Sequence, residues 1–249
     1  MLNSVFWISS NPTEDVAKTL TGARTAMEKV ANERKNIAAV IADNLRASGI
    51  EVDINPETGN ITLRMDESFY FKNDSFQLSE VAKKKLGKML PIYARSLFGT
   101  KEIAQRIDGI SITGYASPKY KKKYVNPFST KGEAYEYNLT LSLNRAQQIV
   151  AFMFGNEIKN FRYKNKMRAL TSVSGKGFMD PIKLDKDNQC KKDKWSKYRK
   201  EECGCGPFHC KKSRRVEINF VLKDQKDAER HFDIIADKLQ DKGPINVGH

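Results

Sequence analysis

An asparagine, a serine and an arginine share the segment of residues 138–146, which reads N-x-x-L-S-x-x-R-A. We expect a helix over residues 138–155, with Asn138 as a loop residue at its entry and Ser142 and Arg145 one turn apart on it. A guanidinium at a helix start lies beside backbone N–H groups that have no partner within the helix, and such donors together bind a carboxylate. The segment therefore predicts an anion site built on Arg145.

The composition of the 249-residue chain indicates a folded domain with a strongly basic surface. Hydrophobic residues make up 39% of the chain, which is enough to fill a core and argues against global disorder. The formal net charge of +14 favours polyanions, acidic membrane surfaces or a negatively charged wall polymer as partners. Nucleic-acid binding is disfavoured, because no recognised nucleic-acid-binding module accompanies the charge.

Catalytic motifs are missing from the sequence. The three histidines do not form a dyad, and there is no nucleophile elbow or phosphate-binding loop. The Gly175-x-Gly177 pair lacks the third glycine and the helix of a phosphate cradle. Asp180 lies among lysines and is predicted to be solvated. We therefore expect a protein that is not an enzyme.

Membrane and export signals are also missing. No run of about 18 apolar residues marks a transmembrane helix. Residues 1–10 lack the basic start and cleavage site of a signal peptide. The expectation is that the protein is cytoplasmic or that these residues lack their targeting segment.

Residues 11–48 are predicted to form one long helix. Its apolar residues recur at intervals of four and three, close to a heptad seam: Val16, Leu20, Ala23, Met27, Val30, Ile37 and Ile41. A helix of this length spans about 55 Å. The length favours a dimerising coiled coil or a spacer, and the alternative is a helix packed on its own domain.

The rest of the chain alternates strands with helices. We expect a hairpin of residues 50–54 and 61–65, a helix over 75–98, strands over 107–114, 169–175 and 215–222, and a last helix over 225–239. The inner face of helix 75–98 is predicted to carry Leu78, Val81, Ala82, Leu86, Leu90 and Tyr93. This order implies an α/β (α+β) sandwich, a mixed sheet packed by helices and preceded by the long helix. The stretches 117–137 and 183–212 interrupt it as long loops, which are usually functional or held by covalent or metal links.

Five motifs together resemble the OmpA-like peptidoglycan-binding domain, which outer-membrane proteins share with flagellar-stator B subunits (MotB-like). They are Phe71 to Leu78 (F-x-x-x-S-x-x-L), Gly114 to Ser117 (family G-[HY]-T-D), the segment 138–146, Gly175 to Pro181 (G-x-G-x-x-x-P) and Arg214 to Ile218 (R-R-V-E). Each motif is weak alone, but five in order over residues 61–222 are specific. The resemblance implies a residual segment 1–10, the helix 11–48, an OmpA-like domain over 50–222 with insertions 117–137 and 183–212, and a C-terminal helix and tail over 223–249.

In such domains a pocket holds the diaminopimelate of the wall peptide, with an arginine on a carboxylate and an aspartate on the amino group. By position, the resemblance makes Arg145 the carboxylate ligand, Asn138 the residue that shapes the loop in front of it, and Arg215 a second contact. Tyr115 stands where the family has His or Tyr, and it either packs or binds. Ser117 replaces the aspartate and supplies no charge to an ammonium group.

Glu133 and Glu136, in the insertion 117–137, have two interpretations. Either carboxylate could replace the missing aspartate. Alternatively, one of them forms a purely structural ion pair with Arg145.

The resemblance implies a non-catalytic protein that binds peptidoglycan in the periplasm, as a homodimer anchored in the inner membrane. Phe6-Trp7-Ile8-Ser9 resembles the stretch before the membrane span of stator B subunits and of the related Zorya-type anti-phage motors, which suggests a membrane motor partner. The span that should follow is missing. Two alternatives stay open: an OmpA-like structural or interaction module that has lost wall binding, as Ser117 permits, and a basic nucleic-acid-binding protein.

Four cysteines lie in the insertion 183–212, at Cys190, Cys203, Cys205 and Cys210, with His209 beside the last. The ligand types suit tetrahedral zinc, but the spacing is not that of a standard zinc knuckle. In the extracytoplasmic location that the resemblance implies, two disulfides stapling a loop without a core are the simpler interpretation. Cys203 and Cys205 are too close to pair with each other, so each would reach Cys190 or Cys210. We favour disulfides, with His209 as a bystander. Zinc bound by the cysteines is the alternative, and no other cofactor is expected.

Overall fold

The computed structural model describes residues 12–50, 53–55, 61–62, 71, 76–129, 132–159, 161–184 and 205–223. The predicted helix 225–239, the segment 1–10, Cys190 and Cys203 lie outside these residues. The elements in chain order are α1 (Pro12–Ala47), β1 (Asp53–Ile54), β2 (Ile61–Thr62), α3 (Glu80–Phe98), α4 (Lys101–Ala104), β3 (Ile107–Gly114), β4 (Lys119–Tyr120), β5 (Lys123–Tyr124), α5 (Glu133–Phe154), α6 (Lys164–Leu170), β6 (Thr171–Gly175), α8 (Cys210–Ser213) and β7 (Val216–Leu222).

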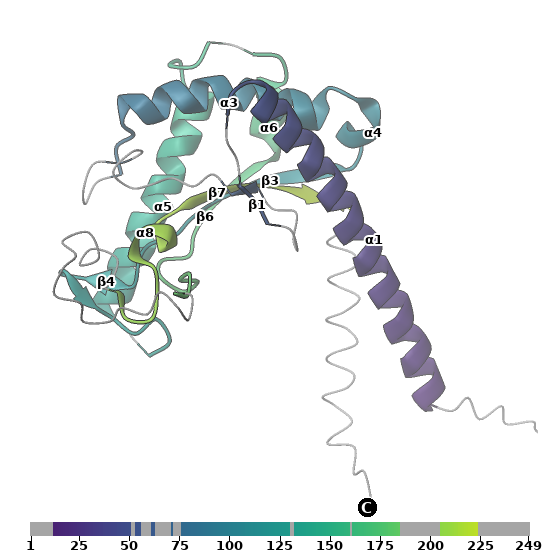
Figure 1. The fold of residues 1–249 in the computed structure, drawn as a ribbon, viewed down its shortest axis with the longest axis horizontal. Helices are drawn as coiled ribbons and strands as arrows, with labels where there is room; N and C mark the ends of the chain where they lie inside the picture. The colour runs from purple at the N-terminus through teal and green to yellow at the C-terminus, as the bar shows by residue number, and fades with distance from the viewer. Residues whose placement is uncertain are drawn as a thin grey trace, which may run out of the picture.

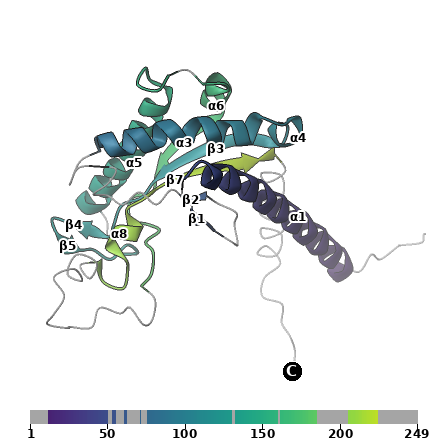
Figure 2. The ribbon, with the colours of Figure 1, turned by 45° about the horizontal axis from the view of Figure 1, so that its top comes forward.

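A three-stranded mixed sheet with the order β6-β3-β7 forms the centre of the domain. Strand β3 runs parallel to β6 and antiparallel to β7. Because β3 is the middle strand, its Ile110 and Ile112 are fully buried. Helix α5 packs on β3 and β6, and α3 packs on α5 and α6, so helices cover the sheet (Figures 1 and 2). The predicted sandwich of a mixed sheet and helices is confirmed.

Helix α3 begins five residues later than predicted, because Ser79 caps it. The Ser79 hydroxyl accepts a 3.1 Å hydrogen bond from the backbone N–H of Ala82, one of the donors that a helix start leaves without a partner. The predicted inner face is buried at Ala82, Leu86, Leu90 and Tyr93 and half-buried at Leu78. Val81 is 50% exposed, and its assignment to the core was wrong. It lies about 100° around the helix from Ala82, where the buried stripe begins.

Helix α1 packs on its own domain through its C-terminal half. Ile37, Ile41 and Leu45 are buried in the common core, and the helix contacts α3. Asn44 Nδ2 also donates a 2.9 Å hydrogen bond to Ser96 Oγ of α3. The alternative interpretation, a helix packed on its own domain, is therefore confirmed for the C-terminal half of α1. The N-terminal half extends away from the sheet (Figure 1), and Met27 of the predicted seam is 40% exposed.

The insertion 117–137 is not the long loop that the sequence suggested. Strands β4 and β5 form a hairpin within it, and α5 begins at Glu133 after Gly132 in a left-handed conformation with φ 70°. The other hairpin, β1–β2, is confirmed in part, with Asp53 opposite Thr62. Strand β6 starts two residues later than predicted, since α6 runs to Leu170. Within the described ranges, no helix is both long and apolar enough to cross a membrane.

Candidate functional site

Helix α5 approaches the sheet most closely where two neighbouring strands end in glycine. Gly114 ends β3 and Gly175 ends β6, and the two are paired in register. A Cβ on Gly114 would overlap the carbonyl oxygen of Ser142, and a Cβ on Gly175 would lie 2.6 Å from the backbone nitrogen of Leu143. Both positions therefore require glycine. Ser142, the serine of the N-x-x-L-S-x-x-R-A segment, lies where the backbone of α5 comes closest to the two strand ends.

Ser142 also binds the turn that follows β6. Its hydroxyl accepts a 2.9 Å hydrogen bond from the backbone N–H of Gly177 and donates a 2.8 Å bond to the carbonyl of Leu139. The Gly177 carbonyl in turn accepts a 2.6 Å bond from the N–H of Ala116, just beyond β3. Gly177 has a left-handed φ of 55°, which only glycine adopts without strain. Three motifs that are far apart in the sequence thus meet at one end of the sheet.

Asn138 lies inside α5 and not at its entry, so that prediction was wrong. The helix begins five residues earlier, and the Asn138 side chain is buried. Its amide Nδ2 donates to the carbonyl of Ala134 at 2.9 Å and to the carbonyl of Lys119 at 3.0 Å. Asn138 therefore fixes the start of β4, the segment that follows Ser117, against the helix.

Arg145 lies in the middle of α5 and is 3% exposed. It is 12 residues from Glu133, or about 18 Å along the helix, so the helix-start donors invoked from the sequence are not beside it. Its guanidinium carbon lies 5.4 Å from the ring centroid of Phe71, and the side chain makes a further interaction. The site is a buried cation stacked on an aromatic ring.

The structural alternative for Arg145, an ion pair with Glu133 or Glu136, is ruled out by the helix itself. All three residues lie on α5, and a separation of at least nine residues corresponds to about 14 Å or more. Glu133 instead contacts the hydroxyl of Tyr120 and lies 3.4 Å from Lys121 Nζ. These contacts lower the pKa of the Glu133 carboxyl, chiefly through the Tyr120 hydrogen bond. By the same spacing, neither glutamate lies beside Arg145 to replace the family aspartate.

Ser117 is buried where β3 leads into the insertion. It is 7% exposed, and its carbonyl accepts a 2.7 Å hydrogen bond from the N–H of Lys119. The position therefore leads directly into the hairpin that Asn138 holds. It brings no charge to this end of the sheet.

Tyr115 and Arg215 form a stacked pair beside Ser117. The Arg215 guanidinium carbon lies 3.7 Å from the Tyr115 ring centroid. Arg215 Nε donates to Glu217 at 2.6 Å, and its Nη atoms donate to the side chain and the carbonyl of Asp180 at 2.9 and 3.1 Å. The Tyr115 hydroxyl donates a 3.1 Å bond to Glu217. Burial, followed by the Glu217 charge, raises the pKa of Tyr115 above its usual range.

This network shows what the sequence missed. Asp180 is exposed, as predicted, but it also pairs with Arg215, a contact that the sequence did not predict. Arg215 directly precedes β7 and Glu217 lies two residues further, on the strand, where the two side chains form an ion pair at 2.6 Å. Tyr115 packs, and each nitrogen of the Arg215 guanidinium already donates a hydrogen bond within the protein.

A hollow beside α5 begins one helical turn beyond Arg145. It has a volume of about 430 Å³, and its lining includes Leu78, Gln148 and Phe152. Leu78 forms a β-bridge with Phe71, the residue on which Arg145 stacks. A larger hollow of about 700 Å³ continues between α3 and the end of α5, where Lys83 bridges to Glu157 at 2.7 Å. Neither Phe71 nor Arg145 lines either hollow, so the hollows come near the pair only through Leu78 and Gln148.

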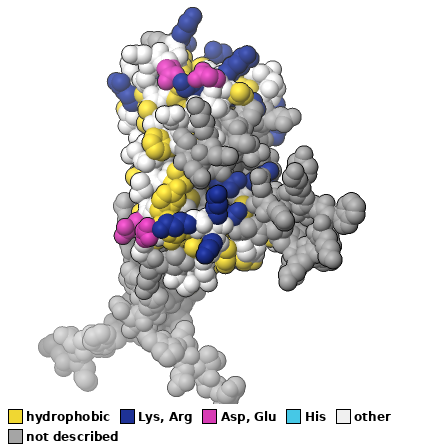
Figure 3. All heavy atoms as spheres, turned by 90° about the vertical axis from the view of Figure 1, so that its left-hand side faces the viewer, with side chains coloured by type: hydrophobic (Ala, Val, Ile, Leu, Met, Phe, Trp, Pro, Cys, Tyr) yellow, Lys and Arg dark blue, Asp and Glu magenta, His cyan; other side chains and the backbone are white. Residues whose placement is uncertain are grey.

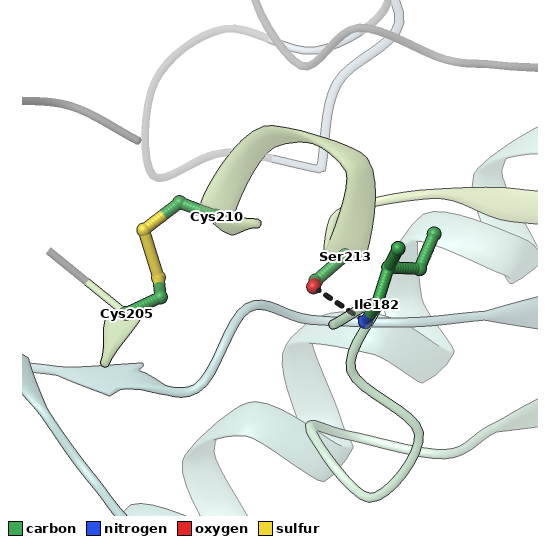
Figure 4. The surroundings of a disulfide bond; sticks show 4 residues. All are labelled: Ile182, Cys205, Cys210 and Ser213. Atoms are coloured by element: carbon green, nitrogen blue, oxygen red, sulfur yellow. Dashed lines mark hydrogen bonds between the residues drawn. A yellow bond between two sulfur atoms is a disulfide. The ribbon is translucent and has the colours of Figure 1, made fainter. Parts of the chain in front are cut away.

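The cysteine loop is held by a disulfide between Cys205 and Cys210, one of the pairings left open by the sequence (Figure 4). The His209 ring is buried, and neither of its nitrogens has a hydrogen-bond partner in the part of the chain that the structure describes. Next to the disulfide, Ser213 Oγ accepts a 3.0 Å bond from the N–H of Ile182, which ties the start of β7 to the segment after β6. Within the described ranges, no three His, Cys, Asp or Glu side chains are grouped to hold a metal.

No family model matches the chain, and no curated protein matches it. Among solved structures, the chain is similar to a putative MotB-like protein from Desulfovibrio vulgaris, at 15% identity and TM-score 0.47 over 78% of this chain and 93% of that one. It is similar to the cell wall anchor of the T6SS from Pseudomonas aeruginosa, at 16% identity and TM-score 0.40 over 76% and 99% of the two chains. It is also similar to the periplasmic domain of Helicobacter pylori MotB, at 13% identity and TM-score 0.39 over 72% and 89%.

Proposed function

We propose that this chain is a non-catalytic cell-wall-binding domain in which Arg145 holds a carboxylate of the peptidoglycan peptide. The observation that carries the proposal is the place of Arg145: a guanidinium that is 3% exposed and stacked on Phe71, one helical turn before Gln148 in the lining of a surface hollow. Its motif converges with two others of the OmpA-like resemblance at one end of the sheet. If the motifs correspond to those of the OmpA-like domain, their segments must meet in the fold in this way.

The physical basis is a charge-assisted hydrogen bond in a partly desolvated site. A guanidinium presents a planar fork of donors that matches a carboxylate, and exclusion of water strengthens each bond. The guanidinium carbon lies 5.4 Å from the centroid of the Phe71 ring, and this cation–π contact helps to position the cation. Binding energy then comes from a preorganised cation.

Ser117 limits the ligand that this site would take. The amino group of diaminopimelate has no carboxylate at that position, and Glu133 and Glu136 lie too far along α5 from Arg145 to serve there. The proposed recognition is therefore of the carboxylate half of the peptide. Arg215 becomes a ligand contact only if it exchanges its bonds to Asp180 or Glu217.

A sedimentation assay with purified sacculi tests the proposal. Wild-type protein should co-sediment, and Arg145→Met, which keeps the aliphatic stem, should stay in the supernatant while retaining its circular dichroism spectrum. Arg24→Met is the matched control, because Arg24 is an exposed arginine on α1 whose loss removes the same charge. Retention of Arg145→Met at the wild-type level would refute the arginine–carboxylate mechanism.

We propose for α1 the role of a spacer and dimerisation element in an envelope protein anchored in the inner membrane, with a membrane motor subunit as partner. The support is the projection of its N-terminal half from the domain and the exposed Met27 in the heptad seam. The location of this domain would then be the periplasm, where a disulfide such as Cys205–Cys210 persists.

The second candidate is an OmpA-like module that keeps the fold and has lost wall binding. The observation that favours it is the buried, uncharged Ser117 in place of the family aspartate. It predicts that wild-type protein fails to sediment with sacculi yet still dimerises. A nucleic-acid binder would instead shift a DNA probe with a steep salt dependence.

A further inference from the structure

The β4–β5 hairpin presents lysines at its tip in a turn that lysine rarely adopts. Tyr120 is paired with Lys123, so Lys121 and Lys122 form a two-residue turn with φ values of 47° and 65°. Positive φ at both central positions defines a type I′ turn, for which Asn-Gly is preferred. A residue with a Cβ is disfavoured there, so the surroundings must hold the hairpin in place.

Helix α5 supports the hairpin from one side. Asn138 Nδ2 binds the carbonyl of Lys119 at the base of β4. The rings of Tyr120 and Tyr137 meet edge to face with centroids 5.5 Å apart. The hairpin is therefore fixed to the same helix that carries Arg145.

The disulfide loop supports the hairpin from the other side. A Cβ on Gly206 would lie 2.8 Å from the Tyr124 ring, so that ring packs directly on the loop backbone next to Cys205. The Phe128 and Phe208 rings lie 6.5 Å apart. Figure 2 shows β4 and β5 beside α8, which Cys210 begins. The insertion and the cysteine loop thus form one rigid surface.

This surface combines exposed rings with cations. Phe128 is 72% exposed, Tyr137 46% and Tyr124 40%. Lys122 and Lys123 are exposed, and within the described part of the chain neither has an ion-pair partner, whereas Lys121 is paired with Glu133. Figure 3 shows basic side chains gathered at two heights on this side of the molecule, with acidic side chains beside each group.

We propose that the hairpin surface, defined as Lys122, Lys123, Tyr124, Phe128 and Tyr137, binds the sugar backbone of the wall glycan. The inference extends the proposed function, because it assigns the glycan to the hairpin and the peptide carboxylate to Arg145. Sugar rings present polarised C–H faces that pack on the negative faces of aromatic rings. Where a sugar of the strand carries no peptide, its carboxylate is free, and the ammonium groups of Lys122 and Lys123 would attract it.

The charge pattern favours such a sparsely charged glycan over a nucleic acid. The exposed carboxylates of Glu133 and Glu136 lie at the start of α5 beside the hairpin. Two lysines without an ion-pair partner among the described residues are few for a polymer with a phosphate at every unit. Asn138 and Arg145 are seven residues apart, about 10 Å along α5. One strand on the hairpin could therefore place its attached peptide near Arg145.

The test is direct binding of peptide-free glycan strands, released from sacculi by an amidase, to the full chain. Wild type should bind, and the double variant Lys122→Gln/Phe128→Ser should bind roughly tenfold more weakly after loss of one ring and one charge contact. The matched control is Lys84→Gln/Val81→Ser, which removes an exposed lysine and a half-exposed apolar side chain from α3. The control should bind the strands like wild type.

The outcomes separate this inference from the proposed function. Equal binding of the strands by wild type and the hairpin variant would overturn the inference. Displacement of the strands from wild type by single-stranded DNA, at equal charge concentration, would also overturn it. If wild type sediments with sacculi through Arg145 but does not bind peptide-free strands, only the glycan assignment fails. If it binds strands through the hairpin while Arg145→Met still sediments with sacculi, only the carboxylate mechanism fails.

Discussion

The backbone N–H of Gly177 donates a 2.9 Å hydrogen bond to the side-chain oxygen of Ser142. This bond joins the turn after β6 to the middle of α5, at the level where Gly114 and Gly175 let the helix backbone approach the sheet. Arg145 lies one turn further along the same helix. The close packing of the α5 backbone on the ends of β3 and β6 therefore sets the position of Arg145, the proposed ligand-binding cation.

The two strand-end glycines should not tolerate alanine. Gly175→Ala would place a Cβ 2.6 Å from a backbone nitrogen of α5 and should lower the free energy of unfolding by about 3 kcal/mol, because backbone cannot move aside as a side chain can. Gly22→Ala on α1 is the control, since nothing lies within 4 Å of its added Cβ, and it should stabilise by about 1 kcal/mol. Urea unfolding measures both. A Gly175→Ala protein as stable as wild type would show that α5 does not cross the sheet here.

Much of this fold follows from periodicity, whereas the site depends on features that periodicity does not reveal. Strand β3 and the stripe from Ala82 to Tyr93 are regular apolar patterns, and both are confirmed. The start of α5 was misplaced because residues 133–137 are rich in tyrosine and glutamate and follow a glycine, which resembles a loop. The β4–β5 hairpin escaped notice because its turn is Lys-Lys and not Asn-Gly.

Some tertiary partners of the site could not have been predicted from local pattern. Asp180 pairs with Arg215 across 35 residues, and the Arg145 guanidinium stacks on Phe71 from a different motif. Only the folded chain brings them together. By contrast, the resemblance had already singled out, as motifs, the segments that meet at the end of β3.

Two buried tyrosines should respond oppositely to loss of their hydroxyl groups. The Tyr93 hydroxyl is buried without a hydrogen-bond partner among the described residues, so Tyr93→Phe should be neutral or stabilise by about 1 kcal/mol. Tyr115→Phe should destabilise by about 1 to 2 kcal/mol, because Glu217 loses a hydrogen bond. Equal effects of the two substitutions in urea unfolding would contradict these environments.

The same tyrosines predict a loss of stability at alkaline pH. Burial raises the pKa of Tyr93 in the folded protein, partly opposed by the Arg34 charge. A raised folded-state pKa gives stability that is fully present below the unfolded pKa of about 10 and is lost as pH rises above it. Tyr93→Phe should therefore flatten the decline in unfolding free energy above pH 10 relative to wild type. An unchanged slope would show that Tyr93 does not contribute.

The Cys205–Cys210 disulfide should stabilise the hairpin side of the domain. Loss of a crosslink closing a loop this short is expected to cost about 2 kcal/mol, so Cys205→Ala/Cys210→Ala should unfold at lower urea. Peptide mapping without reductant should recover these two cysteines as one linked peptide. Recovery of both as free thiols together with stoichiometric zinc would favour the metal alternative instead.

Dimerisation through α1 should depend on the exposed part of the heptad seam. Light scattering should show a dimer for wild type and a monomer for Met27→Lys, because a charge would be buried in the seam. Val40→Lys is the control, since Val40 is 43% exposed on the same helix but lies outside the seam. A wild-type monomer, or a Met27→Lys dimer, would rule out this role for the seam.

Calorimetric titration with a purified wall stem peptide, in free-acid and carboxylate-amidated forms, tests the central claim most directly. Wild type should bind the free acid and lose about 2 kcal/mol or more, roughly thirtyfold in Kd, with the amidated form. Arg145→Met should bind both forms equally weakly, because the group that distinguishes them is gone. If wild type binds the two forms equally, or if Arg145→Met still prefers the free acid, Arg145 is not the carboxylate ligand.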